Sequence, residues 1–116
     1  RKHSVIGESE IHKGGVSSVY VDPKIVFKEA INRLASSIVL CHNHPSGNVL
    51  PSKADDKITQ HLVAAGKMLE IPILDHIIVA RQNWYSYGDH GRIREMEALA
   101  ALVHADPKAK SEKDED

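Results

Sequence analysis

Two histidines, a serine and an aspartate lie close together in the segment CHNHPSGNVLPSKADDK, residues 41–57. His42 and His44 are separated by one residue, so in an extended segment both side chains project to the same side. The turn residues that follow let the chain fold back, and a helix beginning at Ser52 would place Asp55 in its first turn, near the histidines. Two imidazoles and one carboxylate suit zinc and leave its fourth tetrahedral position open.

The chemistry that such a zinc site supports is hydrolysis. A zinc ion with an open position lowers the pKa of its water toward about 7 and polarises a carbonyl oxygen. The site then needs a general base and a donor for the developing oxyanion. Ser52 is the candidate donor, and Glu8 and Glu10, which share one face of the first predicted strand, are the candidate bases.

A structural interpretation of the same residues is also open. Ser52 and Asp55 have the spacing of an ordinary helix start, where the serine caps the helix and the aspartate favours the positive end of its dipole. The His-x-His pair by itself is equally compatible with a polar strand end. The metal site is favoured because all four residues meet at one strand–loop–helix junction.

Two further residues near this junction have more than one interpretation. Cys41 ends an apolar run and is predicted to be a small buried filler rather than a nucleophile. His76 lies beside Asp75 in another apolar run, where a hydrogen-bonded structural role is favoured. A contact that supports the metal ligands is the alternative role for His76.

The elements that must position these residues follow from the spacing of apolar residues and from the helix start and stop signals. They are, in order, two strands before residue 22, an amphipathic helix over residues 23–35, a strand over 36–41, a helix that Ser52 caps and Pro72 closes off, strands over 73–80 and 84–87, and a helix over 92–104. The strand over 36–41 is predicted to be buried on both faces, in the middle of the sheet. This order predicts an α/β sandwich with a mixed sheet.

Composition limits the classes of protein that fit. Hydrophobic residues make up 41% of the 116 residues and charged residues 27%, which indicates one globular domain, over residues 1–104. Residues 105–116 are predicted to be a charged, disordered tail. With one cysteine a disulfide framework is excluded, and without an apolar spanning run or a signal peptide the expected location is the cytoplasm. The net charge of −1 gives no support to nucleic-acid binding.

The stretch HNHPSGNVLPSKAD fits the pattern His-x-His-x7-Ser-x-x-Asp and resembles the JAMM (JAB or MPN+) zinc metallopeptidases. The Pro-Ser-Gly after the second histidine restricts the resemblance to one family within this group. Together with VYVDPKIVFKEAI and ASSIVL upstream and LDHIIVA and YSYGDHG downstream, it is similar to the bacterial RadC family. The likeness runs from about Val5 to Ile93.

The resemblance implies a cytidine-deaminase-like α-β-α sandwich with His42, His44 and Asp55 as zinc ligands and Ser52 as the residue that stabilises the tetrahedral intermediate. It implies cleavage of peptide or isopeptide bonds in a peptide or protein substrate. RadC proteins usually carry a helix-hairpin-helix segment before this domain, so we expect the chain to be a piece of a longer protein. The family also bears a DNA-repair label.

The general base is where the chain departs from the family pattern. JAMM enzymes use a glutamate on an early strand, and here one alignment with that pattern puts Ser9 at the matching position, with a glutamate on either side. Glu10 is favoured because it is closer to the Gly14-Gly15 turn, and Glu8 is the alternative base. The alternative function is therefore a weak or inactive MPN-fold interaction module, with a DNA-repair association as a further possibility.

Overall fold

A computed structural model describes residues 22–105 of the chain. The described elements are α1 (Pro23–Asn32), β1 (Ile38–Asn43), α2 (Lys53–Leu69), β2 (Ile73–Val79), β3 (Trp84–Ser86) and α3 (Arg92–Ala105). Each predicted element within this range is confirmed, with boundaries that shift by at most a few residues. The two strands predicted before residue 22, with Glu8 and Glu10, and most of the predicted tail lie outside the described residues.

The three described strands form a mixed sheet in the order β1-β2-β3. β1 pairs with β2 in parallel and β2 pairs with β3 antiparallel, as the sequence predicts for an α/β fold. The register places Leu40 opposite His76 and His42 opposite Ile78. Residues two apart in a strand share a face, so His42 and His76 are diagonal neighbours on the same face of the sheet.

The prediction that the strand over residues 36–41 is buried on both faces was wrong. Among residues 22–105, β1 pairs with β2 alone, and its place in the middle of the whole sheet stays a prediction, because the two strands predicted before residue 22 lie outside the described residues. The side chains of β1 alternate between half-buried and exposed, instead of being buried on both faces. Cys41 is accordingly exposed and does not fill the core.

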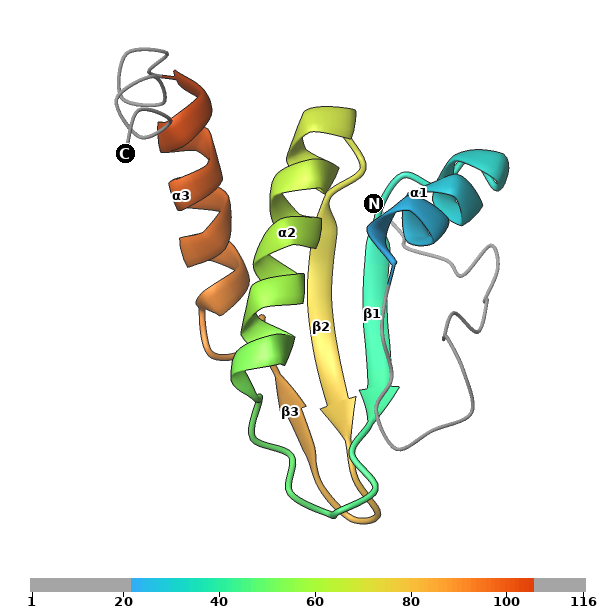
Figure 1. The fold of residues 1–116 in the computed structure, drawn as a ribbon, viewed down its shortest axis with the longest axis vertical. Coiled ribbons are helices and arrows are strands. Elements are labelled where there is room, and N and C mark those ends of the chain that lie inside the picture. The colour runs from blue at the N-terminus through green and yellow to red at the C-terminus, as the bar shows by residue number, and fades with distance from the viewer. Residues whose placement is uncertain (1–21, 106–116) are drawn as a thin grey trace.

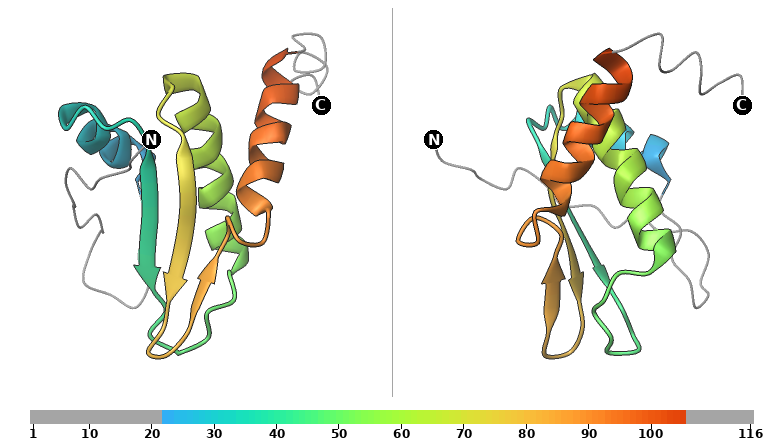
Figure 2. Two further views of the ribbon diagram at one scale, coloured as in Figure 1. Left: turned by 180° about the vertical axis from the view of Figure 1, so that it is seen from behind. Right: turned by 90° about the vertical axis from the view of Figure 1, so that its left-hand side faces the viewer.

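The helices cover the face of the sheet that carries His42. Figures 1 and 2 show α1 and α2 on the same side of the sheet, with α3 beside α2. Each helix contributes apolar residues to one common core, as expected for helices packed on a sheet. This core contains Val26, Phe27 and Ala30 from α1, Leu62 and Val63 from α2, Ile73 and Ile78 from β2, and Tyr87, Ile93 and Met96 from the C-terminal part.

Local hydrogen bonds explain where α2 begins and where it ends. Ser52 caps the first turn, as the sequence predicts. At the other end Glu70 adopts a left-handed conformation with φ of 59°, and the amide of Ile71 donates to the carbonyl of Gly66 at 2.9 Å. This reversal takes the chain directly from α2 into β2. No helix within residues 22–105 is long and apolar enough to cross a membrane.

Candidate metal centre

His42 and His44 lie at the carboxyl end of β1. His42 is the next-to-last residue of the strand, and the amide of His44 continues the sheet ladder by donating to the carbonyl of Val79 at 3.0 Å. Because the extended conformation persists through Asn43, the two imidazoles project to the same side. Their ring centroids are 4.9 Å apart.

The loop after β1 turns the chain toward the start of α2. Gly47 has a φ of 88°, in the left-handed region that glycine adopts without strain, and its amide donates to the carbonyl of His44 at 3.1 Å. The backbone carbonyl of Asn48 accepts a hydrogen bond from Nδ1 of His44 at 2.7 Å. A carbonyl can only accept, so His44 carries a proton on Nδ1 and directs Nε2 toward α2.

Ser52 and Asp55 form a capping box at the start of α2. The amide of Asp55 donates to Oγ of Ser52 at 3.0 Å, and the amide of Ser52 donates to Oδ2 of Asp55 at 2.8 Å. The structural interpretation of this pair is thus confirmed. The same hydrogen bonds hold the carboxylate of Asp55 in a fixed position near the histidines, so capping and metal binding are compatible.

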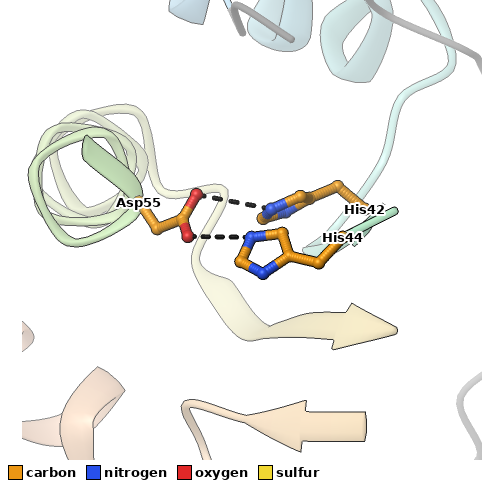
Figure 3. A group of neighbouring side chains, drawn as sticks. All are labelled: His42, His44 and Asp55. Carbon is orange, nitrogen blue, oxygen red and sulfur yellow. Dashed lines mark hydrogen bonds and ion pairs between the residues drawn. The ribbon is translucent and has the colours of Figure 1, made fainter. Parts of the chain in front are cut away.

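The carboxylate of Asp55 faces Nε2 of both histidines (Figure 3). Nε2 of His42 is 3.3 Å from Oδ1, and Nε2 of His44 is 3.1 Å from Oδ2. One potential ligand atom from each of the three residues lies within 4.8 Å of the others, which is the arrangement that could hold a metal ion. The three side chains are between 14% and 21% exposed, so a small ligand can still reach them.

The spacing is close to that of a zinc ligand set. Bonds of about 2.0–2.2 Å in a tetrahedral arrangement place ligand atoms about 3.3–3.6 Å apart. The two short distances here end on different oxygens of Asp55, and one ligand atom from each residue lies within 4.8 Å of the others, so small side-chain movements would bring the three atoms to these distances. An imidazole nitrogen without a proton and a carboxylate oxygen are both acceptors, so this close approach is favourable only with a positive charge between them. A proton or a metal ion can supply that charge.

Electrostatics favour the protonation states in which these residues bind metal. Burial lowers the pKa of His42 from its ordinary value, and His44 acts in the same direction, although the charge of Asp55 opposes both. Burial would raise the pKa of Asp55, but hydrogen bonds from the backbone and hydroxyl of Ser52, followed by the charge interactions with His42 and His44, bring it below its ordinary value. A neutral imidazole and an ionised carboxylate are the forms that coordinate metals.

Two residues behind His42 extend the site into the core. Nε2 of His76 is 2.8 Å from Nδ1 of His42, and Nδ1 of His76 is 2.6 Å from Oγ of Thr59. His76 is 4% exposed, and burial, followed by the neighbouring His42, lowers its pKa to about 4. The supporting contact weighed as an alternative for His76 is therefore present, and His76 also serves as a hydrogen-bonded buried residue.

Thr59 is a site residue that the sequence analysis missed. It lies one helical turn after Asp55 and is fully buried. Its hydroxyl donates to the backbone carbonyl of Asp55 at 2.6 Å. A threonine four residues after a candidate ligand on the same helix face was the available signal.

The structure thus brings together His42, His44, Ser52 and Asp55, as the sequence predicts. Ser52 is exposed and lies beside the other three residues. Glu8 and Glu10 lie outside the described residues, so the choice of general base stays a prediction.

Comparison with known proteins gives one family and many relatives. A family model described as "RadC-like JAB domain" matches residues 1–92. A UPF0758 protein of Flavobacterium johnsoniae is 42% identical over 89 residues, which cover 77% of this chain and 39% of that protein. A UPF0758 protein of Clostridium perfringens is 46% identical over 85 residues, which cover 73% of this chain and 37% of that protein. The match therefore spans about two fifths of the length of these relatives.

Proposed function

The chain belongs to the RadC-like JAB domain family, and on this basis we propose that it is a zinc-dependent metallopeptidase that hydrolyses peptide or isopeptide bonds. The observation that carries the proposal is the convergence of Nε2 of His42, Nε2 of His44 and the carboxylate of Asp55. Two neutral nitrogen ligands and one carboxylate leave zinc with net positive charge and a position for water and substrate.

His42, His44 and Asp55 would hold the ion. When bound, zinc supplies Lewis-acid polarisation of the scissile carbonyl and a water that is nucleophilic at neutral pH. The protein's own contribution is to fix the three ligands before the ion arrives. Asp55 is held by the capping box, and the Nδ1 atom of His44 is held by the carbonyl of Asn48.

Ser52 is proposed to stabilise the oxyanion. Its Oγ accepts the hydrogen bond from the amide of Asp55, and its hydroxyl proton, which in the free site points toward the carboxylate of Asp55, would turn to donate to a substrate oxygen. A donor placed where negative charge develops lowers the barrier, typically by about 3 kcal/mol. Glu10, or Glu8 as the alternative, is proposed as the general base that takes the proton of the water.

The proposed substrate is a peptide or protein. An extended peptide could pair with an exposed strand, a mode that peptide-binding domains commonly use. Nucleic acid is a weaker candidate, because the net charge of −1 provides no field that would attract phosphates.

The first test measures metal and hydrolysis on the same preparations. We expect about one zinc per chain by elemental analysis, by the stoichiometry of a mononuclear site. Zinc should be lost in His42→Ala and kept in His61→Ala, which changes an exposed histidine of α2 outside the site. Incubation of the zinc-loaded protein with a proteome-derived peptide mixture should generate new peptide termini, detected by mass spectrometry.

Variants of Ser52, Glu10 and Glu8 separate zinc binding from catalysis. Ser52→Ala and Glu10→Gln should keep the zinc and reduce cleavage at least tenfold, and Glu8→Gln should do so if it is the base. Zinc binding without cleavage of any peptide would favour the interaction module over the peptidase. Absence of zinc in the wild-type protein, even after zinc is supplied, would contradict the proposal.

A further inference from the structure

A chain of hydrogen bonds connects the backbone of α2 to the metal-facing histidine of β1. The hydroxyl of Thr59 contacts the carbonyl of Asp55 at 2.6 Å and Nδ1 of His76 at 2.6 Å. Nε2 of His76 in turn contacts Nδ1 of His42 at 2.8 Å. Each of these three contacts needs one proton between its two atoms. The direction of one hydrogen bond therefore determines the direction of the next.

The backbone carbonyl sets the direction of this chain. A carbonyl oxygen has no proton, so the hydroxyl proton of Thr59 must point to Asp55. The oxygen of Thr59 is then the acceptor for His76, which must carry its proton on Nδ1. In the opposite direction the hydroxyl would donate to His76, and two oxygens would lie 2.6 Å apart with no proton between them, which is repulsive.

The environment of His76 leaves it with that one proton. The ring is buried between the imidazole of His42, with centroids 4.9 Å apart, and the ring of Tyr87, which is stacked on it at 5.0 Å. A charged imidazolium would be desolvated in this position, so the neutral ring is favoured. With its proton on Nδ1, a neutral His76 has a bare Nε2 that accepts a hydrogen bond from Nδ1 of His42.

We propose that His76, oriented by Thr59, is a positioning residue that holds His42 in the form with a proton on Nδ1 and metal-binding Nε2 directed at Asp55. Its consequence for metal binding rests on the proposed function, but the proton position on His76 is a property of the chain without metal. The two histidine ligands are thus fixed by separate means. His44 donates directly to the carbonyl of Asn48, whereas His42 is fixed through two intermediate side chains.

The arrangement also gives Asp55 two tasks. Its carboxylate faces the metal position, and its backbone carbonyl is the end of the hydrogen-bond chain that orients His42. One residue in the first turn of α2 therefore contributes a ligand and directs another ligand on β1. Outer hydrogen bonds of this kind typically change metal affinity by about 10–100-fold.

The test compares Thr59→Val with Thr59→Ser. Valine has nearly the shape of threonine but cannot accept from Nδ1 of His76, so the proton of His76 should move to Nε2 and face His42. Serine keeps the hydroxyl and serves as the matched control. Long-range nitrogen–proton NMR spectra of the metal-free proteins, at mildly alkaline pH, report which ring nitrogen of each histidine carries the proton.

We expect Nδ1–H on His76 in the wild-type protein and in Thr59→Ser, and Nε2–H in Thr59→Val. Zinc affinity, measured by competition with a chelating dye, should be about 10–100-fold lower in Thr59→Val and near the wild-type value in Thr59→Ser. His76→Gln, whose amide oxygen can accept from His42, should bind zinc more tightly than His76→Leu. If Thr59→Val does not fold, the comparison of His76→Gln with His76→Leu tests the positioning role of His76.

An Nε2–H form of His76 in the wild-type protein would overturn the inference. So would equal zinc affinity in all variants that fold. These outcomes are distinct from a failure of the proposed function: a protein that cleaves no peptide but shows the expected proton position and affinity changes would refute the peptidase and retain the positioning role.

Discussion

Asp55 and Asp56 are neighbours in the sequence, yet their carboxylates serve different parts of the molecule. Asp55 faces the histidines, and Asp56 accepts a hydrogen bond from the hydroxyl of Tyr87 at 2.7 Å. Asp56 also pairs with Arg92 of α3 at 3.0 Å, and the guanidinium lies 4.9 Å from the centre of the Tyr87 ring. The first turn of α2 thus connects the candidate metal centre with α3.

The Asp56 contacts predict a specific loss of stability in acid. Burial would raise the pKa of Asp56, but hydrogen bonds from Arg92 and Tyr87 and the charge of Arg92 lower it below 3.8. A carboxyl whose pKa is lower in the folded state stabilises the fold above its unfolded pKa and loses that contribution as pH falls through the folded pKa. Asp56→Asn should therefore cost about 1 kcal/mol at neutral pH, because solvent screens this partly exposed pair, and less below pH 3.8.

Urea unfolding of wild-type and Asp56→Asn protein over a pH series measures this difference. Asp89→Asn, which changes an exposed carboxylate, is the control. A difference between wild type and Asp56→Asn that stays constant down to the acid unfolding transition would contradict the assignment.

At the scale of single residues, the sequence predicts what local spacing determines. The placement of His42, His44, Ser52 and Asp55 follows from strand period, turn residues and helix capping, all within fourteen residues. The place of Thr59 on the helix face of Asp55 is local, but its contact with His76 and the role of Tyr87 depend on which residues of β2 and the following turn face α2. That register is set by packing between distant segments, so no local pattern specifies it.

Gly66 shows how an element can depend on the lack of a side chain. A Cβ at this position would lie 2.5 Å from the carbonyl oxygen of Ile71, in the tight reversal that leads from α2 to β2. The obstructing atom belongs to the backbone, so relief would require a shift of the start of β2. The glycine is buried in the last third of α2, where alanine would otherwise be favoured in a helix.

We expect Gly66→Ala to destabilise the fold by about 1–3 kcal/mol, in spite of the better helix propensity of alanine. Gln60→Ala, at an exposed position of the same helix, should change the free energy of unfolding by no more than about 0.5 kcal/mol. Chemical denaturation of both variants measures the two values. Greater stability of Gly66→Ala than of the wild-type protein would show that the reversal adapts without cost.

At the scale of elements, the helix and strand order could be predicted, and the buried faces only in part. The helical spacing of apolar residues over 23–35 predicts a buried stripe that includes Ile25, Ile31 and Leu34, but these side chains are 46%, 51% and 86% exposed. Phe27 is buried instead, and Leu34 lies past the end of the helix with a φ of 52°. Periodicity gives the helix, but the orientation of a short helix also depends on the neighbours it meets.

For the whole molecule, the candidate metal centre connects two different layers, the sheet and a helix that packs on it. His42 and His44 belong to β1 and the residue after it, and Asp55 belongs to α2. A bound ion would therefore add a connection between sheet and helix that exists only in the folded state. Ligands that bind only the folded state stabilise it in proportion to the logarithm of their concentration.

Zinc should accordingly raise the melting temperature. At a free zinc concentration 100 times the dissociation constant the gain is about 2.7 kcal/mol, and each kcal/mol corresponds to roughly 4–8 °C for a domain of this size. Removal of zinc with a chelator should reverse the shift. Differential scanning fluorimetry measures it, with no shift expected for His42→Ala and a full shift for His61→Ala.

The overall architecture was the most predictable level, because alternating helices and strands leave few ways to cover a sheet. The mixed α/β sheet and the strand–loop–helix junction that carries His42, His44 and Asp55 are confirmed. The position of a strand within the sheet is harder to predict, since an apolar run such as SSIVLC fits either a central or an edge position, and the strands predicted before residue 22 lie outside the described residues.

The exposed thiol of Cys41 has a practical consequence. Successive residues of a strand point to opposite faces, so Cys41 points away from the face that His42 shares with α2. It is also the one cysteine of the sequence. A fluorophore attached there would be a single, defined reporter beside the candidate metal centre, separated from the ligands by the strand itself, and would signal the arrival of an ion without replacing any residue of the site.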